Sequence, residues 1–239
     1  MSYYGPDLAF IHDAGFGQLA SGAGRVLLGE FQRSGIDQGT VVDIGCGSGI
    51  TAQLLSEAGY SVLGIDLSGS LVEIARQRAP QATFRVGSFI DMALSPCVAV
   101  CAIGEVLNYS FDDRNGKEAR IAFFERVFSS LASGGLFLFD VAGPDRAPDQ
   151  LTRTFVEGEG WTVLVETHAE ASVLFRRIVT YRRSGELYRR DSEEHRLQLL
   201  PPGEIESELQ AIGFGAARIS RYAEQPLLKG LHGFIAGRR

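Results

Sequence analysis

From residue 40 onward, short apolar runs alternate with stretches whose apolar residues recur at helical spacing. Such runs predict strands that are buried on both faces, and they occupy residues 40–44, 61–65, 83–86, 98–103 and 136–141. Helical spacing at residues 50–58, 70–75 and 121–131 predicts the helices between them. This alternation predicts an α/β fold with a doubly wound parallel sheet, which binds ligands at the carboxyl edge of its strands.

The pattern changes after residue 141. A polar connector leads to three runs, at residues 161–170, 172–183 and 186–197, whose short turns predict antiparallel hairpins. A helix from Pro202 to Gly213 and two strands, at residues 216–222 and 232–236, then close the chain. We therefore expect a single domain over residues 1–239, with a core at 40–142 and 201–239 and a three-stranded antiparallel insertion at 158–200.

The first 38 residues show helical spacing that is interrupted by four glycines: Gly15, Gly17, Gly22 and Gly24. Glycine weakens a helix interior, so glycines at this density favour a mobile cover over a rigid core element. We expect an N-terminal helical lid. Three aromatic residues would line a pocket beneath it or pack within it: Tyr3, Tyr4 and Phe16.

Composition narrows the classes of function. The chain has a net charge of −6, which argues against nucleic-acid binding because that depends on an excess of Lys and Arg. Cys46, Cys97 and Cys101 lack the spacing of a zinc site, so we expect no metal and reduced thiols in a cytoplasmic protein. The sequence shows neither a secretory signal nor an apolar stretch long enough for a membrane span.

The segment VVDIGCGSGI, residues 41–50, ends the first strand with glycines at 45, 47 and 49. A turn without side chains lets a ligand touch the backbone, whose N–H groups point toward it. Dinucleotide sites need G-x-G-x-x-G, and Ile50 stands where the third glycine would be. Asp43, two residues before the first glycine, suits a cationic ligand better than a pyrophosphate.

The second strand ends on Asp66. A carboxylate at this position can accept hydrogen bonds from both hydroxyls of a ribose, which indicates an adenosine-like ligand. The alternative is a turn aspartate that caps the next helix.

With these features, the chain resembles the class I S-adenosylmethionine-dependent methyltransferase family. The resemblance rests on VVDIGCGSGI, on GIDLS around Asp66 and on LASGGLFLFDV in the fifth strand. It implies a Rossmann-like seven-stranded sheet whose last strand is antiparallel, with S-adenosylmethionine as the cofactor. Five residues would then surround its methionine end: Asp43, Gly45, Cys46, Gly47 and Gly49.

The resemblance also implies contacts to the nucleoside. Asp66 would bind the ribose, Leu67 would lie against the adenine, and Ile103 would join them at the end of the fourth strand. Many members of the family carry Gly-Asp after the third strand, whereas this chain has Ser88 followed by Phe89. Ser88 can still form a hydrogen bond and Phe89 can cover the purine.

Candidate catalytic residues follow the fourth strand, in AIGEVLNYSFDD. Glu105 and Asn108 are three residues apart, so a helical turn would bring them to one side, with Tyr109 beside them. They would bind an acceptor amine or hydroxyl, or else form a capped loop. His12 would face the acceptor as a general base if the lid closes over the cofactor, although a structural role is the alternative.

The predicted insertion contains His195, another candidate base, and is rich in arginine, including the pairs Arg176-Arg177 and Arg182-Arg183. Adjacent residues on a strand point to opposite faces. These arginines would bind a substrate carboxylate or phosphate, or would pair with glutamates on neighbouring strands. The exposed sheet can also form a dimer contact.

We therefore predict a cytoplasmic enzyme that transfers a methyl group from S-adenosylmethionine to an oxygen or nitrogen of a small molecule. It would act on neither nucleic acid nor membranes and would be a homodimer if the inserted strands pair. The alternatives are a nicotinamide-dependent oxidoreductase and a catalytically silent S-adenosylmethionine-binding protein. A protein acceptor and a carbon acceptor also stay open.

Overall fold

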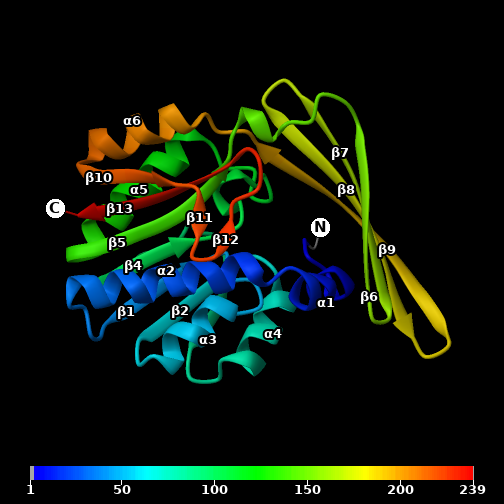
Figure 1. Cartoon of the computed structure of the whole chain (residues 1–239), viewed down its shortest axis with the longest axis horizontal. Coiled ribbons are helices and arrows are strands. Elements are labelled where there is room, and N and C mark those ends of the chain that lie inside the picture. The colour runs from blue at the N-terminus through cyan, green and yellow to red at the C-terminus, as the bar shows by residue number, and fades with distance from the viewer. Residues whose placement is uncertain (1–2, 239) are drawn as a thin grey trace.

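A seven-stranded sheet forms the centre of the computed structural model, which describes residues 3–238 (Figure 1). All neighbouring strands are parallel except β13, which runs antiparallel to both β5 and β10. The order is β10 (Phe214–Ile219), β13 (Leu231–Arg238), β5 (Leu131–Ala142), β4 (Cys97–Ala102), β1 (Thr40–Ile44), β2 (Ser61–Asp66) and β3 (Thr83–Val86). The predicted fold class and the antiparallel last strand are confirmed.

Helices cover both faces of this sheet, each over its own hydrophobic core (Figure 1). One face carries α5 (Lys117–Ser130) and α6 (Pro202–Ile212), which pack Phe124 and Leu209 against Phe139 of β5. The other face carries α2 (Gln18–Ser34), α3 (Ile50–Glu57) and α4 (Gly69–Arg78). Burial of this apolar area on both sides is the main force that holds the layers together.

The order of the strands reverses between β1 and β4. From β1 the chain continues outward to β2 and β3, whereas β4 and β5 lie on the other side of β1. Asp43 of β1 is paired in register with Cys101 of β4, so the carboxyl ends of both strands meet at one edge. A reversal of this kind leaves a crevice at the strand ends, where ligands of such sheets bind.

A second, four-stranded antiparallel sheet packs beside this edge (Figure 1). Its strands are β6 (Thr152–Gly158), β7 (Trp161–Glu170), β8 (Val173–Ser184) and β9 (Leu187–Gln198). The sequence predicted three strands, the first starting at residue 161, and missed β6. Every residue of β6 is exposed, so this edge strand lacks the apolar run by which the others were found.

The sequence predicted a mobile N-terminal lid, but the second of the two N-terminal helices, α2, packs closely against the core. In α2, a Cβ at Gly22 would lie 2.6 Å from the carbonyl oxygen of Tyr222, and one at Gly24 would lie 3.0 Å from Leu54. These glycines therefore allow close packing of a core helix rather than mobility. Only α1 (Pro6–Gly15) extends to the four-stranded sheet, where Leu8 and Ile11 are buried against it.

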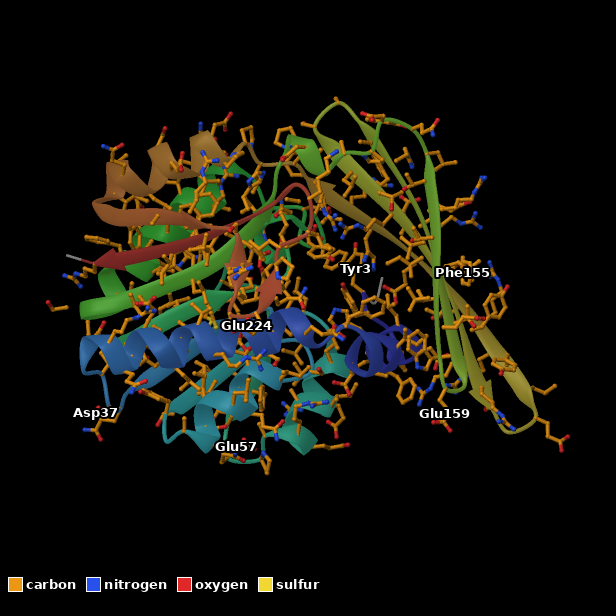
Figure 2. The ribbon with its side chains drawn as sticks, viewed as in Figure 1. Tyr3, Asp37, Glu57, Phe155, Glu159 and Glu224 are labelled. Atoms are coloured by element: carbon orange, nitrogen blue, oxygen red, sulfur yellow. The ribbon has the colours of Figure 1, made fainter. Side chains whose placement is uncertain are left out.

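Alternation along the strands gives the four-stranded sheet two unlike faces. Phe155, Leu164 and Tyr181 point away from the core and are 67%, 40% and 36% exposed; Figure 2 shows Phe155 on the far side of β6. The dimer contact at these strands stays a prediction. Within residues 3–238, none of the helices is long and apolar enough to cross a membrane.

Candidate functional site

Two cavities meet at the carboxyl edge of the seven-stranded sheet. The sheet-edge cavity lies over the ends of β1, β2 and β4. The inter-sheet cavity lies between this edge and the inward face of the four-stranded sheet. Tyr3 is also found between the two sheets (Figure 2). Six residues line both cavities: Tyr4, His12, Phe16, Leu19, Gly104 and Tyr109.

The glycine turn forms the floor of the sheet-edge cavity. Gly45 and Gly47 line it and have φ values of +65° and +53°, a region that favours glycine. A Cβ at Gly45 would lie 2.4 Å from Val106, whereas one at Gly47 would meet no atom within 4 Å. Gly45 therefore allows close packing, and Gly47 leaves its backbone open to a ligand. Cys46 and Gly49 belong to the turn but pack toward the core, so the structure gives them no place on the cavity wall.

Asp66 is oriented by the same turn. Its Oδ2 accepts a hydrogen bond from the backbone N–H of Gly47 (2.9 Å), and its Oδ1 accepts one from that of Ser68 (2.8 Å). Burial raises the pKa of Asp66, although both hydrogen bonds oppose this shift. Each carboxylate oxygen keeps a second lone pair for a ligand hydroxyl.

Asp43 lies beneath the turn and is fully buried. The thiol of Cys101 donates to its Oδ1 at 3.2 Å, and burial raises the pKa of Asp43 to about 7. Its Oδ2 is buried without a hydrogen-bond partner among residues 3–238. An unpaired buried carboxylate oxygen is costly, so it marks a place where a cationic group would be stabilised.

The wall opposite the turn carries the four residues that the resemblance assigned to the nucleoside: Leu67, Ser88, Phe89 and Ile103. Leu67 is 41% exposed, which is unusual for a large apolar side chain and fits a surface that a purine would cover. Asp112 also lines this wall and pairs with Arg114. Sequence reasoning missed Asp112 because it lies in a loop without a pattern.

The boundary between the two cavities carries Tyr4, His12 and Tyr109. The hydroxyls of Tyr4 and Tyr109 are 3.1 Å apart, and burial raises the pKa of both, so they stay protonated. The rings of Tyr4 and His12 meet edge to face, with centroids 5.2 Å apart. Burial lowers the pKa of His12, so its imidazole is neutral near pH 7.

Glu105 lines the inter-sheet cavity, but its carboxylate is already paired. It accepts two hydrogen bonds from Arg176, at 2.6 and 3.0 Å, and one from Arg146 at 3.0 Å. The same ion pairs hold the pKa of Glu105 below its usual value, against the effect of burial. Glu105 therefore joins the four-stranded sheet to the core.

Asn108 does not lie on either cavity wall. Its side chain is fully buried; the amide nitrogen donates to the carbonyls of Ala142 and Gln198, and the amide oxygen accepts from the N–H of Ala142. The structure thus supports the capped-loop interpretation of Asn108, because every atom that would bind an acceptor is occupied by backbone.

His195 is fully buried on β9, where its Nε2 lies 2.9 Å from a carboxylate oxygen of Glu193. Glu193 also accepts hydrogen bonds from the backbone N–H groups of Tyr4 and Gly5, each at 2.8 Å. The carbonyl of Tyr4 in turn accepts a bond from the hydroxyl of Ser68, at 2.8 Å. These contacts hold the segment before α1 between the two cavities.

The arginines of the insertion divide by face. On the outward face, Arg177 pairs with Glu166 and Arg196 with Glu194, as the glutamate-pairing alternative predicted. On the inward face, three arginines pair with acids outside the sheet: Arg176 with Glu105 of the core, and Arg182 and Arg189 with Asp7 of α1. Like Glu105, Asp7 therefore joins the four-stranded sheet to the rest of the protein, a role that nothing in the sequence indicated.

Asp140, at the end of β5, was also missed. It accepts hydrogen bonds from the N–H groups of Gly104 and Glu105 and from the hydroxyl of Tyr222. Burial raises its pKa to about 6. Asp140 thereby fixes the loop after β4, and an acid inside the apolar run LFLFDV was the signal that could have identified it.

These residues fit S-adenosylmethionine. The buried Oδ2 of Asp43 has no partner within residues 3–238, Gly47 leaves its backbone open, and both oxygens of Asp66 can accept further hydrogen bonds. A cationic nucleoside matches this combination better than a pyrophosphate, because two acids and no base flank the turn.

Residues 41–135 match a family model described as "Methyltransferase domain". Among curated proteins, the chain is 28% identical over 197 residues to "Putative methyltransferase YqeM" of Bacillus subtilis (strain 168), covering 77% of this chain and 76% of that protein. It is 35% identical over 78 residues to a magnesium-protoporphyrin O-methyltransferase of Rhodobacter capsulatus, covering 30% of this chain and 35% of that one.

A third curated relative is an 18S rRNA (guanine(1575)-N(7))-methyltransferase of Saccharomyces cerevisiae (strain ATCC 204508 / S288c), 29% identical over 140 residues, covering 53% of this chain and 49% of that one. Apart from YqeM, the chain thus spans about a third to a half of the length of these relatives.

Solved structures share the fold over nearly the whole chain. An S-adenosylmethionine-dependent methyltransferase from Clostridium acetobutylicum ATCC 824 superposes with a TM-score of 0.81 at 16% identity, covering 96% of both chains. CalS10, an amino pentose methyltransferase from Micromonospora echinaspora bound to S-adenosylmethionine, superposes with a TM-score of 0.76 at 20% identity, covering 96% of this chain and 97% of that one.

The sugar N-methyltransferase KedS8 from Streptoalloteichus sp ATCC 53650 gives a TM-score of 0.75 at 22% identity, covering 100% of this chain and 97% of that one. The matched domain includes the glycine turn, Asp66 and the strands that form the sheet-edge cavity. Residues 41–135 are thus a methyltransferase domain, and nearly the whole chain has the fold of S-adenosylmethionine-dependent methyltransferases.

Proposed function

We propose that this protein transfers a methyl group from S-adenosylmethionine to an oxygen or nitrogen of a small-molecule acceptor. The observation that carries the proposal is that the sheet-edge cavity and the inter-sheet cavity meet at Tyr4, His12 and Tyr109. A cofactor in the first cavity and an acceptor in the second would face each other there.

S-adenosylmethionine supplies a methyl group on a positively charged sulfur. Asp66 would hold the ribose, and the wall at Leu67 would cover the adenine. Asp43, which is buried beneath the turn and not on this wall, would stabilise the ammonium group of the cofactor's methionine end, directly or through water. Positioning of the reacting atoms supplies most of the rate in such a displacement. The buried aromatic boundary contributes by holding the acceptor in place and excluding water.

His12 would act as the general base. Its neutral imidazole can accept the proton that the acceptor's O–H or N–H loses, and the hydroxyls of Tyr4 and Tyr109 can position the attacking atom by hydrogen bonding. Glu105 is unsuited to this role because both of its oxygens are paired with arginine.

CalS10 and KedS8, which have the same fold and are named for action on sugars, support a small acceptor. The yeast relative is named for action on rRNA. A net charge of −6 counts against RNA as the acceptor of this chain, because RNA binding relies on a positive surface.

Calorimetric titration with S-adenosylhomocysteine and with NAD tests the cofactor. We expect binding of the first and none of the second; the reverse would favour the oxidoreductase alternative. Formation of S-adenosylhomocysteine from S-adenosylmethionine, assayed with hydroxylated and aminated small molecules, tests the reaction. Saturable cofactor binding without turnover on any acceptor would favour the silent alternative.

A further inference from the structure

The wall of the inter-sheet cavity carries few charges. Of the residues lining it within the described range 3–238, only Glu105, Arg146 and Arg176 are formally charged at neutral pH with histidine neutral. Two guanidinium groups and one carboxylate leave this wall with one net positive charge. The rest of the lining consists mainly of apolar and hydroxyl side chains, which come from the inward face of the four-stranded sheet, from the N-terminal helices and from the loops of the core.

The two arginines are compensated to different degrees. Arg176 forms a bidentate pair with Glu105, through Nη1 at 2.6 Å and Nη2 at 3.0 Å, and its side chain is only 15% exposed. Arg146 donates through Nε to the same carboxylate at 3.0 Å and through Nη1 to the carbonyl of Lys229 at 3.3 Å. Its Nη2 has no partner within residues 3–238, and its side chain is 24% exposed.

The backbone around Arg146 is tightly packed. Arg146 ends a short turn, η2 (Pro144–Arg146), where its N–H donates to the carbonyl of Gly143 at 2.9 Å. A Cβ at Gly230 would lie 2.2 Å from the backbone nitrogen of Arg146, so the two loops are in direct contact. The guanidinium group is therefore presented from a fixed position, which lowers the entropy lost when it binds a ligand.

No uncompensated carboxylate lines the inter-sheet cavity in the described part of the chain, since Glu105 is shared by two arginines. An ammonium group entering this cavity would lose its hydration without meeting a counter-charge. An anion would instead meet the excess positive charge and the free donor of Arg146, and guanidinium matches the oxygens of carboxylate and phosphate.

We infer that the acceptor carries an anionic group, a carboxylate or a phosphate, which binds Arg146 while its methyl-accepting atom lies near Tyr4, His12 and Tyr109. This inference rests on the proposed function, because it concerns the acceptor of the same reaction. It also predicts that an amine acceptor reacts in its neutral form.

Calorimetry tests the anion site without knowledge of the natural acceptor. Protein saturated with S-adenosylhomocysteine is titrated at low ionic strength with benzoate, phenyl phosphate, benzamide and benzylamine. We expect benzoate or phenyl phosphate to bind more tightly than benzamide, and benzylamine not to bind in this cavity. The benzoate and phosphate arms decide between the two anions.

Two variants locate the site. Arg146→Gln should weaken binding of the preferred anion roughly tenfold or more, as expected for loss of a charge-assisted hydrogen bond, and should leave benzamide unaffected. Gln225→Glu adds a negative charge to the same wall with almost no change in shape and should also weaken the anion. Arg153→Gln, on the outward face and paired with Glu166, is the matched control and should change nothing.

The inference is overturned if neither anion binds more tightly than benzamide, if benzylamine binds best, or if Arg146→Gln and Gln225→Glu both bind the anion like the unmodified protein. A preceding titration with S-adenosylhomocysteine distinguishes a failure of the proposed function from a failure of the inference that the acceptor is anionic. Failure of that titration contradicts the proposed function, whereas cofactor binding without anion binding contradicts only the anionic acceptor.

Discussion

The sheet-edge cavity and the inter-sheet cavity are formed by different kinds of interaction. The floor of the first is formed by the glycine turn and Asp66, with Asp43 buried beneath it, all within 24 residues of sequence from Asp43 to Asp66. The second depends on side chains that are far apart in the chain: Arg176 is 71 residues from Glu105, and Glu193 is 189 residues from Tyr4. A local turn therefore forms one half of the site, and long-range ion pairs form the other.

This difference separates the functions of the two halves. The turn offers N–H groups and carboxylates whose arrangement follows from strand geometry, which suits a cofactor of constant shape. The inter-sheet cavity takes its shape from how a second sheet is joined to the first. Changes to one half should therefore leave the other half largely intact, and the following predictions test this separation from the largest effect to the smallest.

Replacement of His12 at the boundary should affect turnover alone. We expect His12→Asn to reduce the rate of methyl transfer on the order of 100- to 10,000-fold, as for loss of a general base. The dissociation constant of S-adenosylhomocysteine should change much less, because His12 lies at the boundary of the two cavities and not at Asp66 or the glycine turn. Turnover that is undiminished, with the same pH profile as the unmodified protein, would exclude His12 as the base.

Removal of the Glu105 carboxylate should destabilise the fold. Glu105→Gln leaves Arg146 and Arg176 without their buried counter-charge, which should lower the free energy of unfolding by about 3–5 kcal/mol. Urea denaturation measures this loss. Glu194→Gln, which breaks an exposed pair with Arg196, should cost no more than about 1 kcal/mol. Equal losses in both variants would contradict the joining role of Glu105.

Removal of the Asp66 carboxylate should act on the other half. Asp66→Ala should weaken S-adenosylhomocysteine about 100-fold by calorimetry, because two hydrogen bonds from ribose hydroxyls to a charged group are lost. Asp37→Ala, an exposed acid before β1, is the control and should bind normally. Unchanged affinity in a folded Asp66→Ala sample would refute the assignment of this cavity to the cofactor.

The pH dependence of cofactor binding should report Asp43. Since burial raises its pKa to about 7, Asp43 is largely protonated below that pH and cannot compensate a cationic group. Affinity for S-adenosylhomocysteine should therefore fall about fivefold from pH 7 to pH 6, following the ionised fraction. Asp43→Asn should bind weakly and independently of pH over this range; a slope that persists in the variant points to another group.

The floor of the sheet-edge cavity was largely predictable because the residues that form it lie close together in the sequence. The strand, the glycine turn and Asp66 each follow from a short pattern that can be read without knowledge of the fold. The sequence did not indicate direction: Asp43, Cys46 and Gly49 were all assigned to the cofactor, but none of them lies on the cavity wall. A pattern places a residue in a turn but does not say which way its side chain points.

The inter-sheet cavity was predicted only in outline. Asp7 and Arg146 became recognisable once distant segments were brought together, because a single charged residue has no period or spacing of its own. Strand β6 was missed for a related reason: burial gives a strand its apolar signature, and β6 is exposed throughout. In the sequence alone, the glycines of α2 indicate mobility. The residues that they pack against lie on other elements, so their close packing is visible only in the structure.

The alternation along β6 and β7 has a practical consequence. Thr154 and Val165 face the inter-sheet cavity, while Arg153 and Glu166, their neighbours in sequence, pair on the opposite face. A protein engineer can thus vary the inward residues to admit a new guest molecule while the outward pairs keep the strands aligned. Such changes leave the cofactor site untouched, so the enzyme could be engineered to methylate a different acceptor.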